Sequence, residues 1–416
     1  MIQHQSFSRR TVVSSCLTLA AAALGLALAA GCSTPKHVDR VPTTLPAQGF
    51  VVAWQADLAL DGTPVKSLHV GDEFIVAYSE ENRAVAVTRA TGAYAFGANV
   101  ARPGEVLHGP VFLKDWTVFP TTTTLGIYDK RGRILRTMEL PFALRSGAVG
   151  VGTLVLMGAD LTNGGRVVAM DTAPSVFRDQ HVLGAKWDAM GSDRSGFSSH
   201  PAVYQTQVFA ATRNGFVYGL RAADGKPLWG VLRDTDYGFH ANGQILAPLA
   251  ADQTGVYAAS RDSKLYCIDV LTGRLKWQYF SGTELREPNA PIVTTDNLVY
   301  LPVAGKGIVA IEKGEGPIRS QKWNIPDAVQ LLAQDNQYTY LLARDRTILA
   351  VDKEKGAVRF RSARNDFAVF GTNLKDGVVY AAGRDGWLYA IKPIAKPGLV
   401  GELVLDVRPL GLVATN

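Results

Sequence analysis

The chain has 416 residues, which is enough for one large repeat domain or for two to three ordinary domains. Hydrophobic residues make up 47% of it and charged residues 19%, with 41 glycines and 20 prolines. That composition excludes a disordered chain, a coiled coil and a multi-span membrane protein. The net charge of +6 is spread too thinly along the chain to indicate nucleic-acid binding.

Residues 1–31 have the order of an export signal peptide. Arg9 and Arg10 precede an uncharged apolar run over residues 12–31. The run ends in Leu28-Ala29-Ala30-Gly31 directly before Cys32, a segment that resembles a bacterial lipobox. The resemblance implies cleavage before Cys32 and attachment of acyl chains, palmitate among them, to this cysteine. An uncleaved anchor is the alternative, because about 20 apolar residues can span a bilayer.

A lipidated Cys32 would tether the protein to a membrane without spanning it. Each buried methylene contributes about 0.8 kcal/mol of membrane affinity, so several acyl chains hold a soluble body at the surface. In lipoproteins of this type, an aspartate directly after the lipidated cysteine signals that the protein is retained and not sorted to the outer membrane. Ser33 stands at that position, which resembles an outer-membrane sorting signal and implies the periplasmic side of that membrane. Inner-membrane sorting stays open, as does the choice between Sec export and the twin-arginine route. Residues 32–48 are polar and carry three prolines, which predicts an extended tether.

A repeat organises residues 49–416, and it is clearest where one sequence pattern occurs twice. Asn214 to Trp229 and Ser263 to Trp277 each contain an alternating apolar strand, a turn that ends in glycine, and a tryptophan. Weaker copies of this pattern are found along the chain when its segments are aligned on the residue that ends the apolar strand. These residues lie about 40 to 50 positions apart: Thr88, Asp129, Asp171, Arg221, Asp269, Glu312, Asp352 and Lys392.

Each unit has the periodicity of antiparallel strands. Phe216, Tyr218 and Leu220 alternate with smaller residues, which is typical of a β-strand. Another short strand lies upstream of each of these, so a unit offers about four strands, as a β-propeller blade does. The eight units therefore predict an all-β, eight-bladed β-propeller of four-stranded antiparallel blades, with seven blades as the alternative.

The turn of each unit predicts how neighbouring units pack. Glycine tolerates the positive φ of a tight turn, and four residues later an aromatic ring returns to one face of the next strand. There it can pack against the adjacent unit. Trp54 lies in a strand with no inner strands before it, which predicts that this strand completes the last blade and closes the ring. The other residues predicted to shape the repeat are Phe96, Gly225, Trp229, Asp269, Gly273, Trp277 and Phe360.

The segment from Tyr266 to Trp277 reads Tyr-x-Ile-Asp-x-x-Thr-Gly-x-x-x-Trp and resembles the repeat of PQQ-type β-propellers. With the leader, the length and the eight units, the chain resembles the BamB family of outer-membrane lipoproteins. That resemblance implies a non-catalytic, monomeric scaffold that docks onto the barrel-assembly protein BamA and assists insertion of β-barrel proteins. The family's leucine-arginine stretch and paired aspartates are not matched at residues 192–197 and 243–248. A propeller that binds a different envelope protein or a ligand is therefore the alternative.

No catalytic residue, metal site or cofactor is predicted. PQQ-dependent dehydrogenases resemble one another in having an adjacent cysteine pair beside the cofactor, and this sequence has no such pair. Its histidines do not fall at metal-ligand spacing. Cys267 lies in an apolar strand, which favours a buried structural thiol over a nucleophile.

Two long connections carry the residues predicted to bind a partner. Residues 188–197 and 233–240 lengthen the intervals between repeats, and extra length on one side of a propeller commonly builds a binding face. Their arginines and aromatic rings are of the types enriched at protein interfaces. The predicted contact residues are Arg194, Phe197, Arg233, Tyr237 and Phe239, and ordinary solvated loops are the alternative.

Overall fold

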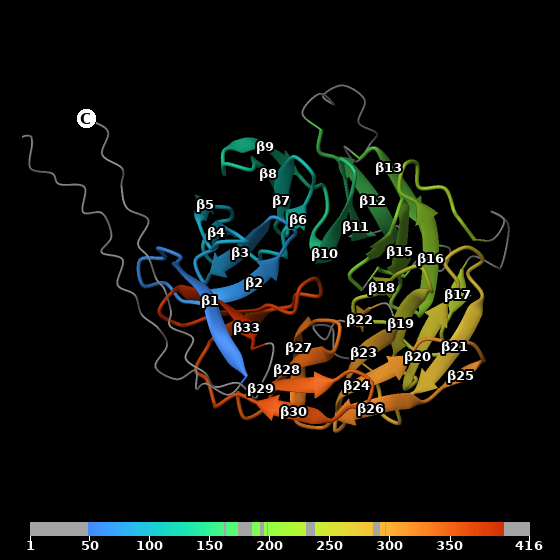
Figure 1. Ribbon diagram of the computed structural model, residues 1–416. Coiled ribbons are helices and arrows are strands. Elements are labelled where there is room, and N and C mark those ends of the chain that lie inside the picture. The colour runs from blue at the N-terminus through green and yellow to red at the C-terminus, as the bar shows by residue number, and fades with distance from the viewer. Residues whose placement is uncertain are drawn as a thin grey trace, which may run out of the picture. The chain divides into compact units, whose positions relative to one another are not determined.

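The computed structural model describes residues 49–161, 164–173, 185–191, 195–197, 199–229, 238–285, 292–295 and 297–394. Within these ranges all regular structure is β-strand, and the strands form eight sheets that follow one another around a ring (Figure 1). The eight-bladed β-propeller predicted from the repeat is therefore confirmed, and the seven-bladed alternative is wrong.

Each blade has four antiparallel strands, and in most neighbouring pairs of blades the two first strands contact each other. In order from the first strand to the fourth, blade 1 is β2 (Val65–Val70), β3 (Phe74–Ser79), β4 (Arg83–Thr88) and β5 (Tyr94–Asn99); blade 2 is β6 (Val111–Phe112), β7 (Trp116–Pro120), β8 (Thr124–Asp129) and β9 (Ile134–Glu139); blade 3 is β10 (Leu144–Val151), β11 (Leu154–Leu161), β12 (Gly164–Asp171) and β13 (Trp187–Met190); blade 4 is β14 (Ala202–Tyr204), β15 (Gln207–Ala211), β16 (Phe216–Arg221) and β17 (Phe239–His240). Blade 5 is β18 (Ala250–Ala251), β19 (Val256–Ser260), β20 (Lys264–Ile268) and β21 (Leu275–Phe280); blade 6 is β22 (Val293–Thr294), β23 (Leu298–Val303), β24 (Gly307–Glu312) and β26 (Gln321–Ile325); blade 7 is β27 (Ala328–Gln334), β28 (Tyr338–Ala343), β29 (Ile348–Asp352) and β30 (Val358–Arg361); blade 8 is β31 (Val369–Gly371), β32 (Val379–Ala382), β33 (Trp387–Pro393) and β1 (Phe50–Asp57). A short strand from blade 6, β25 (Ile318–Arg319), pairs in parallel with β21 at the outer edge of blade 5.

The first strand of the sequence closes the ring. β1 pairs antiparallel with β33, so that Phe50 lies opposite Pro393 and Asp57 opposite Trp387. In Figure 1 the blue strand β1 accordingly lies beside the red strand β33. The fourth strand of the last blade thus comes from the other end of the chain, as Trp54 predicts.

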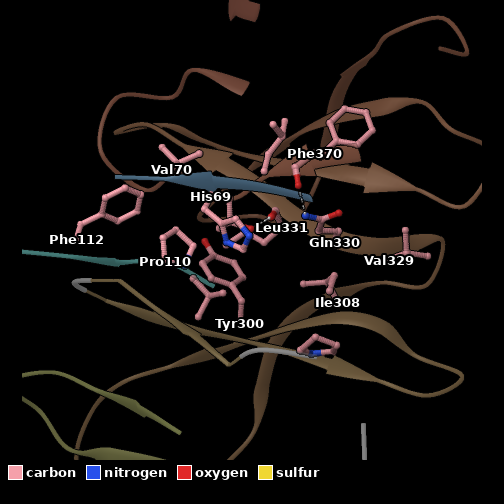
Figure 2. Close-up of a pocket in the computed structure, with 14 residues that line it drawn as sticks. His69, Val70, Pro110, Phe112, Tyr300, Ile308, Val329, Gln330, Leu331 and Phe370 are labelled. Carbon is pink, nitrogen blue, oxygen red and sulfur yellow. Dashed lines mark hydrogen bonds between the residues drawn. The ribbon is translucent and has the colours of Figure 1, made fainter. Parts of the chain in front are cut away.

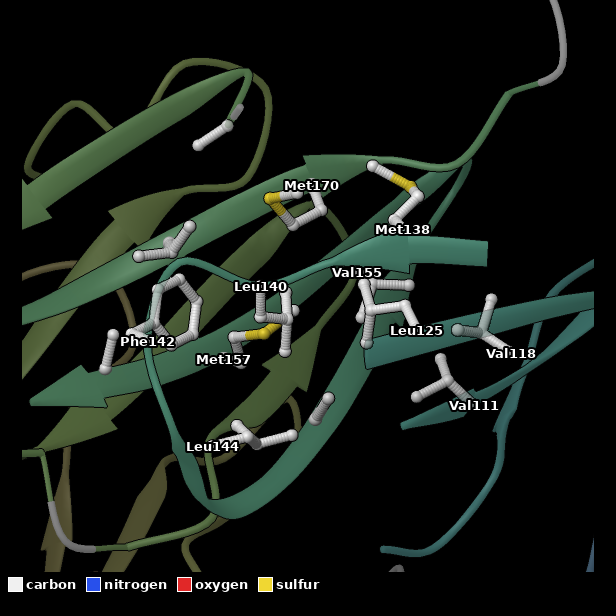
Figure 3. Packing of buried hydrophobic residues seen from close by; sticks show 14 of the residues in the cluster. Val111, Val118, Leu125, Met138, Leu140, Phe142, Leu144, Val155, Met157 and Met170 are labelled. Atoms are coloured by element: carbon white, nitrogen blue, oxygen red, sulfur yellow. The ribbon is translucent and has the colours of Figure 1, made fainter. Parts of the chain in front are cut away.

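The hydrophobic core is divided into eight buried clusters, and each lies between two neighbouring blades. Figure 3 shows the cluster in which Leu125 and Met138 of blade 2 meet Met157 and Met170 of blade 3. Because every blade buries both of its faces this way, the ring is held by contacts between successive blades.

A recurring contact joins an aromatic residue, placed after the turn between the third and fourth strands of one blade, to the same turn of the next blade. A Cβ built on Gly273, whose φ is +70°, would lie 2.7 Å from the ring of Trp229, and one on Gly132 would lie 2.6 Å from Phe96. Glycine is therefore needed both for the backbone conformation and for the close approach of the ring. The indole N–H of Trp229 donates to the Val270 carbonyl at 2.9 Å, which fixes the ring on that turn.

The two long connections differ from their sequence interpretation. Residues 187–190 are β13, and Phe239–His240 are β17, so parts of both supposed links are the fourth strands of blades 3 and 4. The extra length of blade 3 lies before β13, between Asp171 and Trp187. The reason is pairing: Ala169 lies opposite Trp187, and Phe216 lies opposite His240, which draws these residues into the sheets.

Candidate docking face

The propeller has two faces that carry different segments. Because the strands of a blade are antiparallel, the turn from the first strand to the second and the turn from the third to the fourth lie on one side, here named the turn face. The turns from the second strand to the third, and the connections between blades, lie on the other side, here named the loop face. Phe50 at the start of β1 pairs with Pro393 at the end of β33 and so lies on the turn face.

The predicted contact residues within the described ranges lie in the core. Phe197 is 3% exposed, and its ring centroid is 5.9 Å from that of Tyr218. Phe239 is partly buried with its ring centroid 4.9 Å from that of Tyr266. These rings pack between blades and are not presented as free aromatic surface. Arg194, Arg233 and Tyr237 lie outside the described residues, and the partner-binding role of all five residues stays a prediction.

The connections on the loop face are fixed by hydrogen bonds to the next blade. The backbone N–H of Arg213 donates to the Gly196 carbonyl at 2.8 Å, and that of Arg261 donates to the Gln244 carbonyl at 2.9 Å. The Arg261 guanidinium also donates to Gln244 Oε1 at 2.8 Å and lies 3.4 Å from Glu284. The connections before blades 4 and 5 are therefore braced against the turns of those blades.

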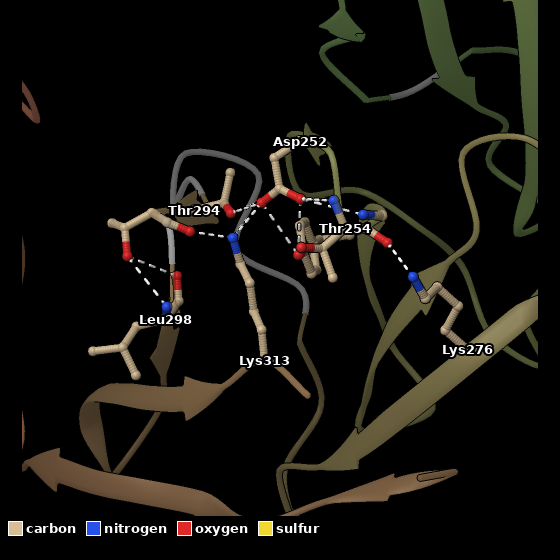
Figure 4. A network of polar contacts seen from close by, with 9 residues as sticks. Asp252, Thr254, Lys276, Thr294, Leu298 and Lys313 are labelled. Atoms are coloured by element: carbon tan, nitrogen blue, oxygen red, sulfur yellow. Dashed lines mark hydrogen bonds and ion pairs between the residues drawn. The ribbon is translucent and has the colours of Figure 1, made fainter. Parts of the chain in front are cut away.

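The turn face is held by ion pairs between blades. Lys313 of blade 6 contacts Asp252 of blade 5, with side chains 6% and 20% exposed, and Thr294 donates to the same carboxylate (Figure 4). Burial alone would raise the pKa of Asp252, but the hydrogen bonds from Lys313 and Thr294 outweigh it and hold this pKa below its ordinary value.

Cations at the same position of other blades form related pairs. Arg89 of blade 1 lies 2.7 Å from Asp376 of blade 8, and Lys130 of blade 2 contacts Glu73 of blade 1. Arg89, Lys130 and Lys313 each directly follow the third strand of a blade. The repeat therefore places a cation where it reaches an acidic side chain in the turn of the preceding blade.

A central cavity of about 790 Å³ lies among the first strands. Figure 2 shows His69, Phe112, Tyr300 and Phe370 around it. The described residues that line it are mostly apolar and include no aspartate, glutamate, lysine or arginine: Leu68, His69, Val70, Pro110, Phe112, Val293, Tyr300, Pro302, Ile308, Val329, Gln330, Leu331, Phe370 and Thr372. An anionic cofactor would find no counter-charge among these residues.

Two buried titratable groups, His69 at the central cavity and Cys267 between blades 5 and 6, are held neutral by burial. Burial lowers the pKa of His69 to about 4, while His69 Nε2 and the Ser67 hydroxyl form a hydrogen bond at 2.9 Å. Burial raises the pKa of the Cys267 thiol to about 12, which disfavours the thiolate that a nucleophile requires.

Among the described residues no three His, Cys, Asp or Glu side chains gather as metal ligands. Across the same ranges no helix has the length and apolar character needed to cross a membrane.

These features define a closed eight-bladed propeller of the PQQ-type repeat, with a braced loop face. Residues 123–361 match the family model described as outer membrane protein assembly factor BamB. This match covers more than half of the sequence, and the chain belongs to that family.

Relatives and solved structures agree with the family match. The chain is 28% identical to outer membrane protein assembly factor BamB of Yersinia pestis over 318 residues, which cover 67% of this chain and 77% of that protein. It is 32% identical to the BamB of Escherichia coli K12 over 158 residues, which cover 36% of this chain and 40% of that protein. The crystal structure of BamB from Moraxella catarrhalis superposes with a TM-score of 0.58 at 16% identity, covering 82% and 99% of the two chains, and shares the fold.

Proposed function

We propose that the protein is a non-catalytic scaffold that assists assembly and insertion of β-barrel proteins into the outer membrane. The observation that carries this proposal is the family match over residues 123–361, which spans blades 3 to 7 completely within a closed ring. The relatives named for this role in Yersinia pestis and Escherichia coli support it. A rigid ring whose blades are fixed to one another suits an adaptor, because it presents loops in constant relative positions.

The partner in this proposal is a protein of the barrel-assembly machinery, with BamA as the specific candidate. The loop face is the proposed docking side, since the connections before blades 4 and 5 are braced there by hydrogen bonds. A preformed surface loses little conformational entropy when a partner binds. The propeller acts as a monomer in this scheme.

We further propose that Cys32 carries the lipid that holds the protein on the periplasmic side of the outer membrane, with residues 1–31 removed and residues 32–48 as tether. The lipobox-like segment before Cys32 supports this. Cys32→Ser is expected to release the protein into the soluble periplasmic fraction. Continued pelleting of Cys32→Ser with membranes would instead favour an uncleaved anchor.

The partner is tested by crosslinking in cells, affinity purification of the full-length protein and mass spectrometry. Recovery of the barrel-assembly protein is the expected result, and Arg194→Ala/Arg233→Ala/Tyr237→Ala is expected to reduce it. Enrichment of an unrelated envelope protein, with no assembly component, would replace the proposal with the alternative of a propeller that binds a different partner.

A further inference from the structure

The loop face carries four similar turns, in each of which an arginine is followed by asparagine or aspartate. The turn between the second and third strands reads Arg213-Asn214 in blade 4, Arg261-Asp262 in blade 5, Arg344-Asp345 in blade 7 and Arg384-Asp385 in blade 8. The backbone shows that these positions are equivalent, because the residue before the arginine donates its N–H across the turn in three of them. The distances are 2.8 Å for Thr212 to Phe216, 2.9 Å for Ala343 to Thr347 and 2.9 Å for Gly383 to Trp387.

The arginines are held at their backbone and exposed at their side chains. The N–H groups of Arg213, Arg261 and Arg344 donate to carbonyls of the connection before each blade, at 2.8, 2.9 and 2.7 Å. The side chains of Arg213, Arg344 and Arg384 are exposed. These hydrogen bonds thus fix the backbone of Arg213 and Arg344, while the guanidinium groups of both residues lie in solvent.

In three of the four turns an aspartate follows the arginine, and each of these aspartates accepts a hydrogen bond from a group other than that arginine. Asp345 accepts from the Thr347 hydroxyl at 2.7 Å and from Arg361 at 2.7 Å, Asp262 accepts from the Tyr266 hydroxyl, and Asp385 accepts from the Trp387 N–H at 3.3 Å. Within the described ranges no side-chain hydrogen bond or ion pair is formed by Arg213, Arg344 or Arg384. Three of the four guanidinium groups therefore form no direct pair with a described side chain.

We propose that this arginine arc, Arg213, Arg261, Arg344 and Arg384, is a docking surface for an acidic segment of a protein partner. Guanidinium groups form planar, two-point contacts with carboxylates, and four of them spread over blades 4 to 8 suit an extended acidic stretch. The inference rests on the proposed adaptor role and adds the chemistry of the partner.

The geometry favours a protein over a lipid surface as the occupant. β1 begins at Phe50 on the turn face, and the arc lies on the loop face at the opposite ends of the strands. In a protein tethered through residues 32–48, the chain therefore enters the propeller on the side away from the arc. An acidic protein segment can reach the loop face without requiring the ring to turn over against the bilayer.

The arc is tested with a fluorescein-labelled polyglutamate peptide and the purified full-length protein in detergent. Wild type is expected to raise the anisotropy of the peptide at low salt and to lose this binding at high salt, because exposed charge contacts are screened. Arg213→Glu/Arg344→Glu/Arg384→Glu is expected to bind the peptide roughly tenfold more weakly or worse. A milder variant, Arg213→Ala/Arg344→Ala/Arg384→Ala, covers the case in which charge reversal impairs folding.

The matched control reverses three exposed cations in the turn-face turns: Lys226→Glu/Arg274→Glu/Lys355→Glu. It makes the same change in net charge, and its affinity for the peptide is expected to stay within about twofold of wild type. Equal losses in both variants would overturn the arc in favour of a general charge effect. If Cys32→Ser protein binds phosphatidylglycerol vesicles through the arc and does not bind polyglutamate, the arc binds lipid. That result would overturn the proposal that its partner is an acidic protein segment.

Crosslinking in cells separates this inference from the proposed function. Capture of assembly proteins by wild type and by the control, but not by the arc variant, supports both proposals. Equal capture of assembly proteins by all three overturns the arc and leaves the function standing. Arc-dependent capture of an unrelated protein supports the arc and overturns the function.

Discussion

The two faces of the propeller use their charges in opposite ways. On the turn face, cations that follow the third strands pair with acids of the preceding blade, as Lys313 does with Asp252 and Arg89 with Asp376. On the loop face, Arg213 and Arg344 extend into solvent, and Asp345 beside Arg344 is paired with Arg361 instead. The cations that follow third strands thus hold the ring, while the exposed arginines of the loop-face turns stay available. Stability and partner binding are therefore expected to respond to different substitutions.

The largest expected effect comes from the aromatic packing beside the turn face. Trp277 is fully buried against Tyr257 with ring centroids 5.8 Å apart, so Trp277→Ala should lower the free energy of unfolding by about 3 to 5 kcal/mol. Denaturant unfolding monitored by circular dichroism measures it. An unchanged midpoint would contradict the packing role of this ring.

Next in size is the ion pair between blades 5 and 6. Lys313→Met should cost roughly 2 to 3 kcal/mol of stability, because it leaves the partly buried Asp252 carboxylate without its cation. Arg344→Met, the same change at an exposed loop-face residue, should stay within about 0.5 kcal/mol. Equal effects of the two substitutions would abolish the distinction between the faces.

Between the faces, His69 makes stability depend on pH. Its pKa of about 4 in the folded protein lies below the unfolded value of 6.5, so the unfolded state takes up the proton first as pH falls. The unfolding free energy should therefore decrease from pH 6.5 down to pH 4, by about 2 kcal/mol at pH 5 from this residue. Unfolding curves of wild type and His69→Gln across this range measure the effect. A wild-type slope identical to that of His69→Gln would exclude it.

A smaller contrast tests the indole hydrogen bonds. The N–H of Trp229 donates to the Val270 carbonyl at 2.9 Å, whereas Trp277 Nε1 finds no hydrogen-bond partner within the described part of the chain. Trp229→Phe should consequently cost about 1 kcal/mol more than Trp277→Phe. Equal losses, measured by denaturant unfolding, would show that the hydrogen bond contributes nothing beyond ring packing.

The smallest expected effect is on stability at the arginine arc. Arg213→Ala/Arg344→Ala/Arg384→Ala should change the unfolding free energy by no more than about 0.5 kcal/mol per site, because these side chains are exposed. Thermal unfolding measures this. A large loss would mean that the arginines hold the ring, as the turn-face cations do.

The architecture could be predicted from the sequence because it depends on local periodicity. The residues aligned at the ends of the apolar strands, such as Thr88, Asp129 and Glu312, do end third strands. Trp54 has no inner strands before it in the chain, and this alone indicated that it closes the last blade. Strand alternation and glycine turns act over a few residues, so a single sequence records them.

Features that depend on distant contacts could not be predicted this way. Trp187 packs against Gly225 as the other aromatic residues do, but the added length after Asp171 removed it from the expected spacing. Arg89 meets Asp376 across a separation of 287 residues, which no local pattern records. The Arg-Asp turns are visible in the sequence, yet only the structure distinguishes exposed arginines from paired ones.

The most direct test of the assembly role is the amount of folded β-barrel protein in outer membranes of cells that lack this protein. We predict a decrease, measured by quantitative mass spectrometry and heat-modifiable migration. Wild type and Lys226→Glu/Arg274→Glu/Lys355→Glu should restore the amounts, and Arg213→Glu/Arg344→Glu/Arg384→Glu should not. Unchanged barrel amounts in the deletion strain would contradict the proposed function.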